Sequence, residues 1–300
     1  MAHWNMGGEG LDVSDRHQGQ MEAEAMSDHE DKANMTRRDA LRVGAGAAAA
    51  ALASKAGGAE GRVGKFQQSA SLWCYKKGMT LDELCVELKQ IGMVGVDLCG
   101  PKEWPTLKKH GLVGTMTGTH GLTNGLAEPD FHEDCLKRIR ESIDATAAEG
   151  FRNVITFSGN RRGMDDEVGL ENCVKALKQV AGYAEQKKVC INLEYLNSAK
   201  NHKDYMADST KWCVELVRRV GSERVKVLYD IYHAGVMGED ILADIRDHHE
   251  CWGHYHTGGV PGRHEIDDKQ TLDYPAIMKA IAETGFDGYV AHEFIPERDP

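Results

Sequence analysis

The sequence lacks the marks of several protein classes. Lysine and arginine number 36 against 47 aspartate and glutamate residues, which gives a formal net charge of −11. A nucleic-acid surface needs clustered cations to displace counterions, so no nucleic-acid partner is expected. The eight cysteines contain no C-x-x-C pair, which argues against a zinc knuckle or a disulfide scaffold. The composition is ordinary for a soluble enzyme and leaves small polar or anionic substrates open.

The amino-terminal segment does not read as a folded domain. Residues 1–34 are polar, glycine-rich and acidic without apolar periodicity, so we expect a disordered leader. Residues 35–62 resemble a twin-arginine export signal and linker, because Arg37 and Arg38 precede an apolar run at 43–53 that is too short to span a membrane permanently. The protein would then be periplasmic and free of the membrane after signal removal. The alternative is an alanine-rich helical linker on a cytoplasmic protein.

Residues 63–300 repeat one pattern of a short apolar run, a polar loop, an amphipathic stretch and a turn. This alternation is typical of parallel strands joined by crossover helices, and eight strands predict a (β/α)8 TIM barrel as the catalytic domain. An open doubly wound sheet is the alternative, but no G-x-G-x-x-G follows the first predicted strand. The predicted strands are 71–75, 95–98, 113–117, 153–157, 189–194, 225–230, 252–256 and 289–293. The predicted helices are 81–91, 104–110, 131–149, 167–187, 209–220, 240–247 and 274–284.

The eighth helix of the barrel is predicted to be missing or very short. The last predicted strand ends at Glu293 and the sequence ends at Pro300, so a helix of normal length does not fit after it. We expect a gap in the helical ring, covered by a partner subunit of a homo-oligomer or by the amino-terminal segment. A truncated gene would give the same sequence.

Four residues of metal-binding type end the last four predicted strands, namely Glu194, Asp230, His256 and Glu293. Side chains at the carboxyl ends of barrel strands converge on one face, so these four are expected to meet. Three carboxylates and one imidazole suit one divalent metal ion, Mn²⁺ or Mg²⁺ first and Co²⁺ or Zn²⁺ less specifically. Each residue alone is more simply a capped strand end or a salt bridge. Four in corresponding positions favour a metal centre.

The densest polar stretch of the chain is GHYHTGGVPGRHEID at residues 253–267. Together with NLEYLN at 192–197, DIYH at 230–233 and GYVA at 288–291, it resembles the xylose isomerase-like TIM-barrel superfamily of sugar isomerases and epimerases. The resemblance is greatest to the hydroxypyruvate isomerase family. It covers the chain from about residue 69 to the end, and PGRHE is its most specific motif.

The resemblance implies that Glu194, Asp230, His256 and Glu293 bind the metal, and that Glu194 and Glu293 also serve as the acid and base pair. The chain departs from the pattern at two positions. Hydroxypyruvate isomerases often carry glutamine in place of His256, whereas histidine is typical of ketose epimerases. Lys200 stands where epimerases tend to carry a carboxylate that contacts substrate. The substrate is therefore left open.

Five further residues are candidates for binding the substrate. The resemblance implies that His233 and Arg263 contact it and that His254 lines the pocket. Asn197 lies in the loop after the fifth predicted strand, and His120 lies just beyond the third. The alternatives are a rim salt bridge for Arg263 and a role in holding a metal ligand for His233.

These residues could isomerise a small hydroxy-keto acid or sugar. The reaction removes a carbon-bound proton and stabilises an enediolate, which a divalent cation chelated by neighbouring oxygens favours. A ketose 3-epimerase or an inosose-type dehydratase would use nearly the same ligands. A non-catalytic sugar-binding protein would not need both glutamates. An abasic-site endonuclease would need more ligands on the early strands and a basic groove, and neither is visible.

Overall fold

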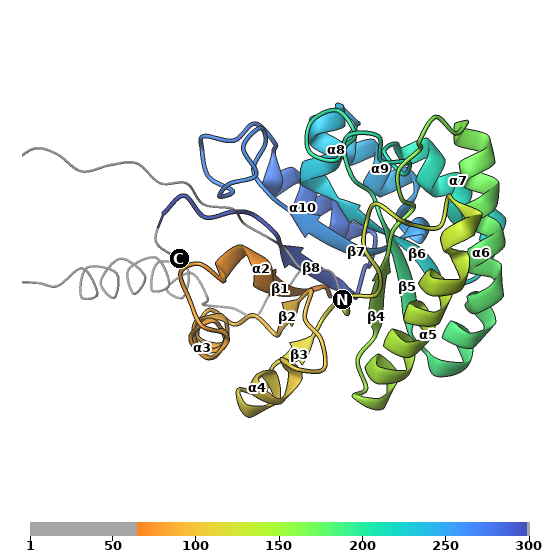
Figure 1. The fold of residues 1–300 in the computed structure, drawn as a ribbon. Coiled ribbons are helices and arrows are strands. Elements are labelled where there is room, and N and C mark those ends of the chain that lie inside the picture. The colour runs from red at the N-terminus through yellow and green to blue at the C-terminus, as the bar shows by residue number, and fades with distance from the viewer. Residues whose placement is uncertain (1–64, 299–300) are drawn as a thin grey trace, which may run out of the picture. The chain divides into compact units, whose positions relative to one another are not determined.

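The structure is a barrel of eight parallel strands. The computed structural model describes residues 65–298. Within that range the strands are hydrogen-bonded in the order β3-β2-β1-β8-β7-β6-β5-β4, as can be followed in Figure 1. The strands are β1 (Gln67–Ser71), β2 (Gly95–Asp97), β3 (Val113–Gly114), β4 (Asn153–Thr156), β5 (Cys190–Glu194), β6 (Val225–Asp230), β7 (Trp252–Thr257) and β8 (Tyr289–His292).

The two ends of this sheet, β3 and β4, are joined through Thr117. This residue forms parallel bridges to Cys99 and to Val154. Its N–H donates to the carbonyl of Asn153 at 3.0 Å, and its own carbonyl accepts from the N–H of Ile155 at 2.9 Å. These bridges close the sheet on itself, which confirms the predicted (β/α)8 TIM barrel.

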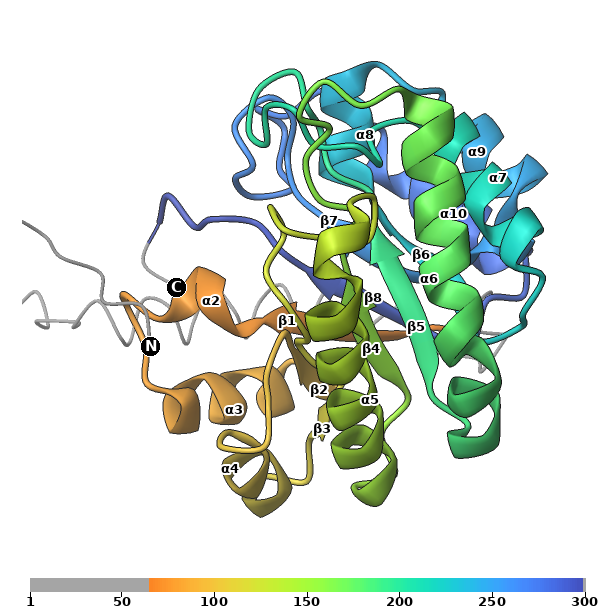
Figure 2. The same ribbon diagram turned by 45° about the vertical axis from the view of Figure 1, so that its right-hand side comes forward.

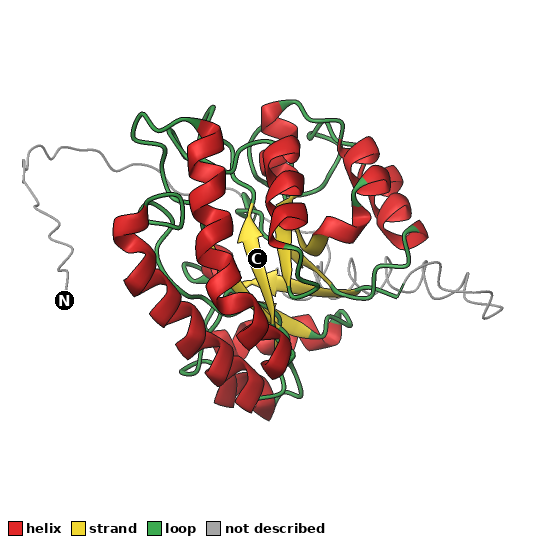
Figure 3. Ribbon diagram, turned by 90° about the vertical axis from the view of Figure 1, so that its right-hand side faces the viewer, coloured by secondary structure: helices red, strands yellow, loops and turns green. Residues whose placement is uncertain are grey.

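Helices cover the outer face of the barrel, as Figures 2 and 3 show. α5, α6 and α7 pack side by side, and α9 packs against α10. Local sequence sets the helix ends, since Thr80 forms a capping box with Glu83 at the start of α3 and Gly221 follows α7 with a φ of 72°. The longer helices are α3 (Leu81–Gln90), α4 (Trp104–Lys109), α5 (His132–Ala148), α6 (Asp166–Lys187), α7 (Thr210–Val220), α8 (Ile231–Met237), α9 (Ile241–Asp247) and α10 (Tyr274–Glu283).

Much of the barrel interior is lined by polar side chains. In most TIM barrels the interior is filled by branched apolar side chains instead. Alternate strand residues face inward, and Asp97, Asn192 and His254 belong to this inward set and are fully buried. The large apolar clusters lie in the layers between the strands and the helices. The third apolar cluster is small and consists of Met116, Ile155 and Leu228. The outer layers therefore supply most of the hydrophobic burial, and the interior combines polar side chains with this small cluster.

Two elements differ from the prediction. The first strand is Gln67–Ser71 rather than 71–75, and Leu72–Tyr75 forms a short helix, α2. The strand was missed because its inward residues, Ser69 and Ser71, face the polar interior and give no apolar alternation. The helix α8 was also missed, since it follows β6 without a loop and its N-cap is Asp230 itself.

Residues 293–298, which follow β8, form no helix. The expected gap in the helical ring, and what covers it, stay predictions. The predicted leader at 1–34 and the predicted signal and linker at 35–62 both lie outside the described residues. Among the helices of residues 65–298, none combines the length and apolar character that crossing a membrane requires.

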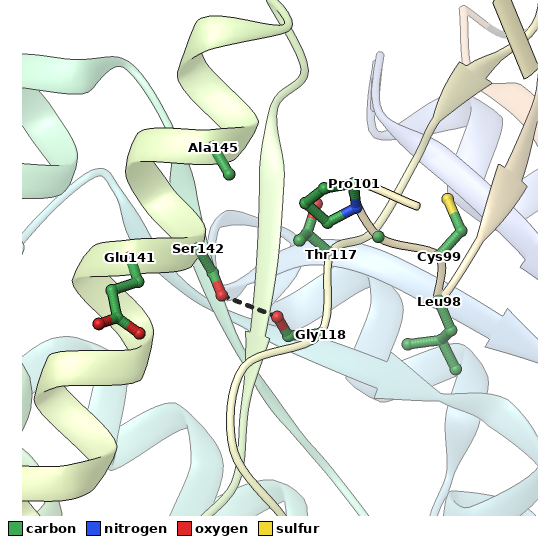
Figure 4. Close-up of a pocket in the computed structure, with 9 residues that line it drawn as sticks. Leu98, Cys99, Pro101, Thr117, Gly118, Glu141, Ser142 and Ala145 are labelled. Carbon is green, nitrogen blue, oxygen red and sulfur yellow. Dashed lines mark hydrogen bonds between the residues drawn. The ribbon is translucent and has the colours of Figure 1, made fainter. Parts of the chain in front are cut away.

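A cavity of about 380 Å³ lies on the outer side of the barrel, between the loop after β2, the end of β3 and helix α5 (Figure 4). Ser142 of α5 donates a hydrogen bond of 2.8 Å to the carbonyl of Gly118 at this place. The wall also contains Leu98, Pro101 and Glu141. The predicted metal ligands belong to β5–β8, so this cavity is separate from their site.

Candidate metal centre

The four predicted metal ligands meet at the carboxyl ends of four neighbouring strands. Glu194 ends β5, Asp230 ends β6, His256 lies near the end of β7 and Glu293 follows β8. One ligand atom from each lies within 4.8 Å of the others, and all four residues are buried. The Nδ1 atom of His256 is 2.8 Å from Glu293 Oε2, 3.4 Å from Glu194 Oε1 and 3.8 Å from Asp230 Oδ2. The imidazole therefore faces all three carboxylates.

This cluster fits a divalent cation by its charge. Three buried carboxylates repel one another, and burying uncompensated charge is costly. Arg263 supplies one positive charge, because its Nη2 atom lies 2.5 Å from Glu293 Oε2 and 3.5 Å from Asp230 Oδ2. The cluster and Arg263 together then carry two net negative charges, which one divalent cation would neutralise. In the described chain the Nδ1 atom of His256 faces only these acidic side chains, so its lone pair is directed at the place where an ion would lie.

The ligands differ in how firmly they hold their charge. Burial raises the pKa of Glu194, and it raises the pKa of Asp230 to about 7 against the opposing charge of Arg263. Burial alone would also raise the pKa of Glu293, but His256 and Arg263 hold it below its ordinary value. The carboxylates, Glu293 first, raise the pKa of His256 well above its ordinary value despite burial. Without a metal, a proton on His256 therefore balances part of the negative charge.

Arg263 is fixed between two aromatic rings. Its guanidinium carbon lies 5.3 Å from the centre of the Trp73 ring and 5.3 Å from that of Tyr232, which are cation–π distances. Trp73 also donates from Nε1 to Glu293 Oε1 at 2.6 Å. The alternative for Arg263, a rim salt bridge with Glu265 or Asp267, is not what the structure shows, because Arg298 pairs with both of them.

His233 and Asn197 form a buried pair beside the cluster. The amide of Asn197 is oriented by the backbone N–H groups of Lys200 and Asn201, which donate to its Oδ1 at 3.1 and 2.8 Å. Its Nδ2 therefore donates to His233 Nδ1, at 2.5 Å. This leaves the proton of His233 on Nε2, which lies 3.7 Å from Asp230 Oδ2 without a hydrogen bond in the described chain. Burial lowers the pKa of His233, so it is a neutral donor.

The other two predicted substrate residues lie further from the cluster. His254 is fully buried one layer below His256 on β7, and its Nε2 is 3.1 Å from Asp97 Oδ1. The ring nitrogens of His120 lie 2.8 Å from the Thr156 hydroxyl and 2.9 Å from the carbonyl of Gly121. Whether either contacts a substrate stays a prediction.

The structure adds two residues that sequence reasoning did not assign to the site. Asp97 ends β2, and its Oδ2 is 2.8 Å from Nε2 of His256. Trp73, which lies within the predicted strand 71–75, contacts both Glu293 and Arg263. A signal for Asp97 was present, since a carboxylate lies one residue before the end of the predicted strand 95–98, close to the position that the four predicted ligands occupy on their strands.

The fold and the site define a TIM barrel with a buried cluster of three carboxylates and a histidine at the carboxyl ends of its strands. Residues 105–300 match the family model described as "Xylose isomerase-like TIM barrel", which is more than half of the chain. The chain therefore belongs to the xylose isomerase-like TIM barrel family, as the sequence motifs predicted.

Relatives within this group carry several names. A human protein named "Putative hydroxypyruvate isomerase" is 27% identical over 134 residues, 45% of this chain and 47% of that protein. The "D-psicose 3-epimerase" of Ruminiclostridium cellulolyticum is 29% identical over 199 residues, 61% of this chain and 64% of the epimerase. The "2-oxo-tetronate isomerase" of Pectobacterium atrosepticum is 24% identical over 218 residues, 68% and 82%. The match thus spans about half the length of the human relative.

Solved structures share the fold. A structure titled as an AP endonuclease, family 2, from Brucella melitensis matches with a TM-score of 0.68 and 22% identity, over 77% of this chain and 94% of that one. The D-psicose 3-epimerase of Clostridium cellulolyticum H10 with D-tagatose matches with a TM-score of 0.65 and 18% identity, over 76% and 85%. At these identities the matches establish the barrel alone.

Proposed function

We propose that this protein is a divalent-metal-dependent isomerase of a small hydroxy-keto acid or sugar, similar to hydroxypyruvate isomerase. The observation that carries the proposal is the meeting of Glu194, Asp230, His256 and Glu293 within 4.8 Å, in a buried site with one arginine. The names of the relatives, which are isomerases and epimerases of sugars and keto acids, support the same reaction class.

The four ligands would hold one metal ion, with Mn²⁺ or Mg²⁺ favoured by three oxygen donors and Co²⁺ or Zn²⁺ as alternatives. When bound, the ion would supply Lewis-acid polarisation of a substrate carbonyl. The protein's own groups then perform the proton transfers. The carboxylates that would transfer these protons lie at the ends of strands, which fix their positions.

Glu194 and Glu293 would act as the acid and base pair. They come from β5 and β8, so the ligands of β6 and β7 lie between them. Carboxylates on two sides of one substrate can remove a proton from one carbon and return it to the neighbouring carbon or to the opposite face. Burial raises the pKa of Glu194, whereas His256 and Arg263 hold the pKa of Glu293 below its ordinary value, so Glu194 would be the more basic of the two.

His233 and Arg263 would orient the substrate. The Nε2–H of His233 faces the cluster as an unused neutral donor and suits a hydroxyl or carbonyl oxygen. Arg263, held flat between Trp73 and Tyr232, can present its remaining N–H groups to a carboxylate or a hydroxyl. These roles require a substrate with adjacent oxygens, as both hydroxypyruvate and ketoses have.

A ketose 3-epimerase is the second candidate. The supporting observation is that His256 contributes its Nδ1 to the cluster. In the family pattern, histidine at this position is typical of ketose epimerases, whereas hydroxypyruvate isomerases often carry glutamine. The D-psicose 3-epimerase relative points the same way. An inosose-type dehydratase would use the same ligands and is separated by experiment.

The test is deuterium exchange. The Mn²⁺-loaded or Mg²⁺-loaded protein is incubated in D₂O with hydroxypyruvate and, separately, with a panel of ketoses, and the products are analysed by NMR. An isomerase is expected to place deuterium on the carbon that receives the proton, and a 3-epimerase on C3 with inversion. Loss of water instead of exchange would identify a dehydratase. Binding of sugars without exchange or turnover would contradict the proposal and favour a non-catalytic protein.

A further inference from the structure

His256 has different partners on its two ring nitrogens. Nδ1 faces the carboxylates of Glu293, Glu194 and Asp230, whereas Nε2 is 2.8 Å from Oδ2 of Asp97. Asp97 lies on β2, which is separated from β7 by β1 and β8 in the strand order. Both residues are fully buried. The contact therefore crosses the barrel interior, below the proposed metal centre.

We propose that Asp97 is a positioning residue that makes His256 a metal ligand. Its carboxylate accepts the Nε2–H of the ring, which fixes the tautomer and leaves the lone pair of Nδ1 directed at the ion. The same contact sets the rotation of the ring between β2 and the three acidic ligands. The inference rests on the metal centre of the proposed function and adds a fifth residue to it, one that touches neither metal nor substrate.

Asp97 is itself held rigidly, as this role requires. The hydroxyl of Thr115 is 2.6 Å from its Oδ1 and 3.0 Å from the hydroxyl of Ser69. Nε2 of His254 lies 3.1 Å from the same Oδ1 atom. Oδ1 is thus anchored by the interior of the barrel, and Oδ2 is left for His256. A carboxylate fixed in this way imposes its direction on the ring that it binds.

The surroundings of Asp97 are compatible with this role, because both of its carboxylate oxygens face hydrogen-bond partners and none of these partners is a second acidic group. The competing interpretation is a second metal ion held by Asp97, His254 and His256, whose ligand atoms also lie within 4.8 Å of one another. The two interpretations differ in the number of ions bound per chain.

The first experiment measures Mn²⁺ affinity and stoichiometry by calorimetry on the full chain and on Asp97→Asn. We expect one ion per chain in both proteins and a dissociation constant raised about 10-fold to 100-fold in the variant, since the loss of such a partner typically costs this much. In a His256→Ala background the Asp97→Asn change should have no further effect on affinity. A purely structural role for Asp97 would weaken binding in both backgrounds.

The matched control is Asp244→Asn. Asp244 is also a buried carboxylate that accepts from two hydroxyls, those of Thr210 and Tyr229 at 2.6 Å each, and it lies outside the cluster. It is expected to lower the unfolding temperature while leaving the Mn²⁺ affinity unchanged. The comparison separates loss of stability from loss of ring positioning.

A second measurement needs no variant. Nitrogen-15 NMR of the imidazoles in the Mg²⁺-loaded wild-type protein should show the proton of His256 on Nε2. A proton on Nδ1 would overturn the inference, as would unchanged affinity in Asp97→Asn or two ions per wild-type chain with one in the variant. Failure of the wild-type protein to bind Mn²⁺ would instead contradict the proposed function, so the two failures are distinguishable.

Discussion

Glu194 and Glu293 face the same point from different strands, but their surroundings are unlike. Glu293 receives hydrogen bonds from Trp73 and Arg263, whereas Glu194 lacks a comparable donor among the contacts of the described chain other than His256. A carboxylate that binds a cation and also moves a proton has to balance these two tasks. The unequal environments separate them, because one group is held ionised and the other is left more basic.

Replacing either glutamate by glutamine should therefore abolish proton transfer while keeping the shape of the site. We expect Glu194→Gln and Glu293→Gln each to lower turnover by about 10²–10⁴-fold at saturating Mn²⁺, measured as deuterium incorporation. Glu265→Gln is the control, because this glutamate pairs with Arg298 on the neighbouring rim. Full activity in both glutamine variants would remove the two residues from the acid and base roles.

Metal affinity should rise with pH. Asp230 has a pKa of about 7 in the metal-free site, and the pKa of Glu194 is also raised, so protons compete with the ion. Below pH 7 the affinity for Mn²⁺ should fall by about tenfold per pH unit for each proton displaced. Calorimetry at several pH values measures this, and equal affinity at pH 5.5 and 7.5 would contradict it.

The same shift affects the stability of the metal-free protein. A carboxyl group whose pKa is raised on folding stabilises the fold below its unfolded pKa and loses that contribution as the pH rises through about 7 for Asp230. The increase in unfolding temperature on adding Mn²⁺ should therefore be larger at pH 8 than at pH 5. Differential scanning calorimetry with and without a chelator tests the sign.

The meeting of the four residues of the candidate metal centre could be predicted from sequence, because each one ends a predicted strand that the pattern makes visible. A carboxylate or histidine after an apolar run is a local signal, and four such signals at barrel spacing point to one site. Asp97 carries the same signal but on a strand of three residues, and its partner His256 is 159 positions away. Contacts between inward side chains on distant strands depend on how the barrel closes and on the strand register, and neither can be read from the pattern of a single sequence.

At the scale of elements, the sequence pattern did not predict β1 and α8 correctly, because the pattern of apolar residues does not mark either of them. β1 has the sequence QQSAS, whose inward residues meet a polar interior, so no apolar alternation marks it. α8 begins directly after β6, and the side chain of Asp230 caps it by accepting the N–H of His233 at 3.0 Å. The same carboxylate was interpreted only as a metal ligand. Because Asp230 was assigned to the metal centre, its second role as the N-cap of α8 was missed.

The loop that carries Arg263 is attached to α10 through Tyr274. The tyrosine hydroxyl donates to the carbonyl of Gly258 at 2.8 Å and accepts from its N–H at 2.9 Å. Tyr274→Phe leaves both buried backbone groups without this partner, which should cost about 1–3 kcal/mol of unfolding free energy. It should also raise KM, because Arg263 follows in the same loop.

Tyr255→Phe is the matched control for that prediction. Tyr255 is fully buried, and its hydroxyl makes no hydrogen bond within residues 65–298. Removing this hydroxyl should leave the unfolding free energy within about 0.5 kcal/mol or raise it, because the desolvation cost of the polar group is removed. Urea unfolding of both variants makes the comparison. Equal stability losses would show that the Gly258 contacts have no special weight.

At the scale of the whole molecule, the sequence predicts export, and this prediction concerns residues outside the described range. If residues 35–62 are a twin-arginine signal, changing Arg37 and Arg38 to lysine should keep the protein in the cytoplasm. Cell fractionation measures the distribution, and Arg42→Lys serves as the control. Unchanged periplasmic protein, or cytoplasmic wild-type protein, would favour the helical-linker interpretation.

The strands β5 to β8, which carry the four residues of the candidate metal centre, are consecutive neighbours in the sheet. The loops after β3 and β4 stand on the remaining arc of the barrel and contribute none of the four residues. On the proposed function, evolution could therefore vary these two loops, and with them the shape of the substrate pocket, while the cluster stays intact. Exchanging the loops with those of a relative should alter which substrate is used and leave the affinity for Mn²⁺ unchanged.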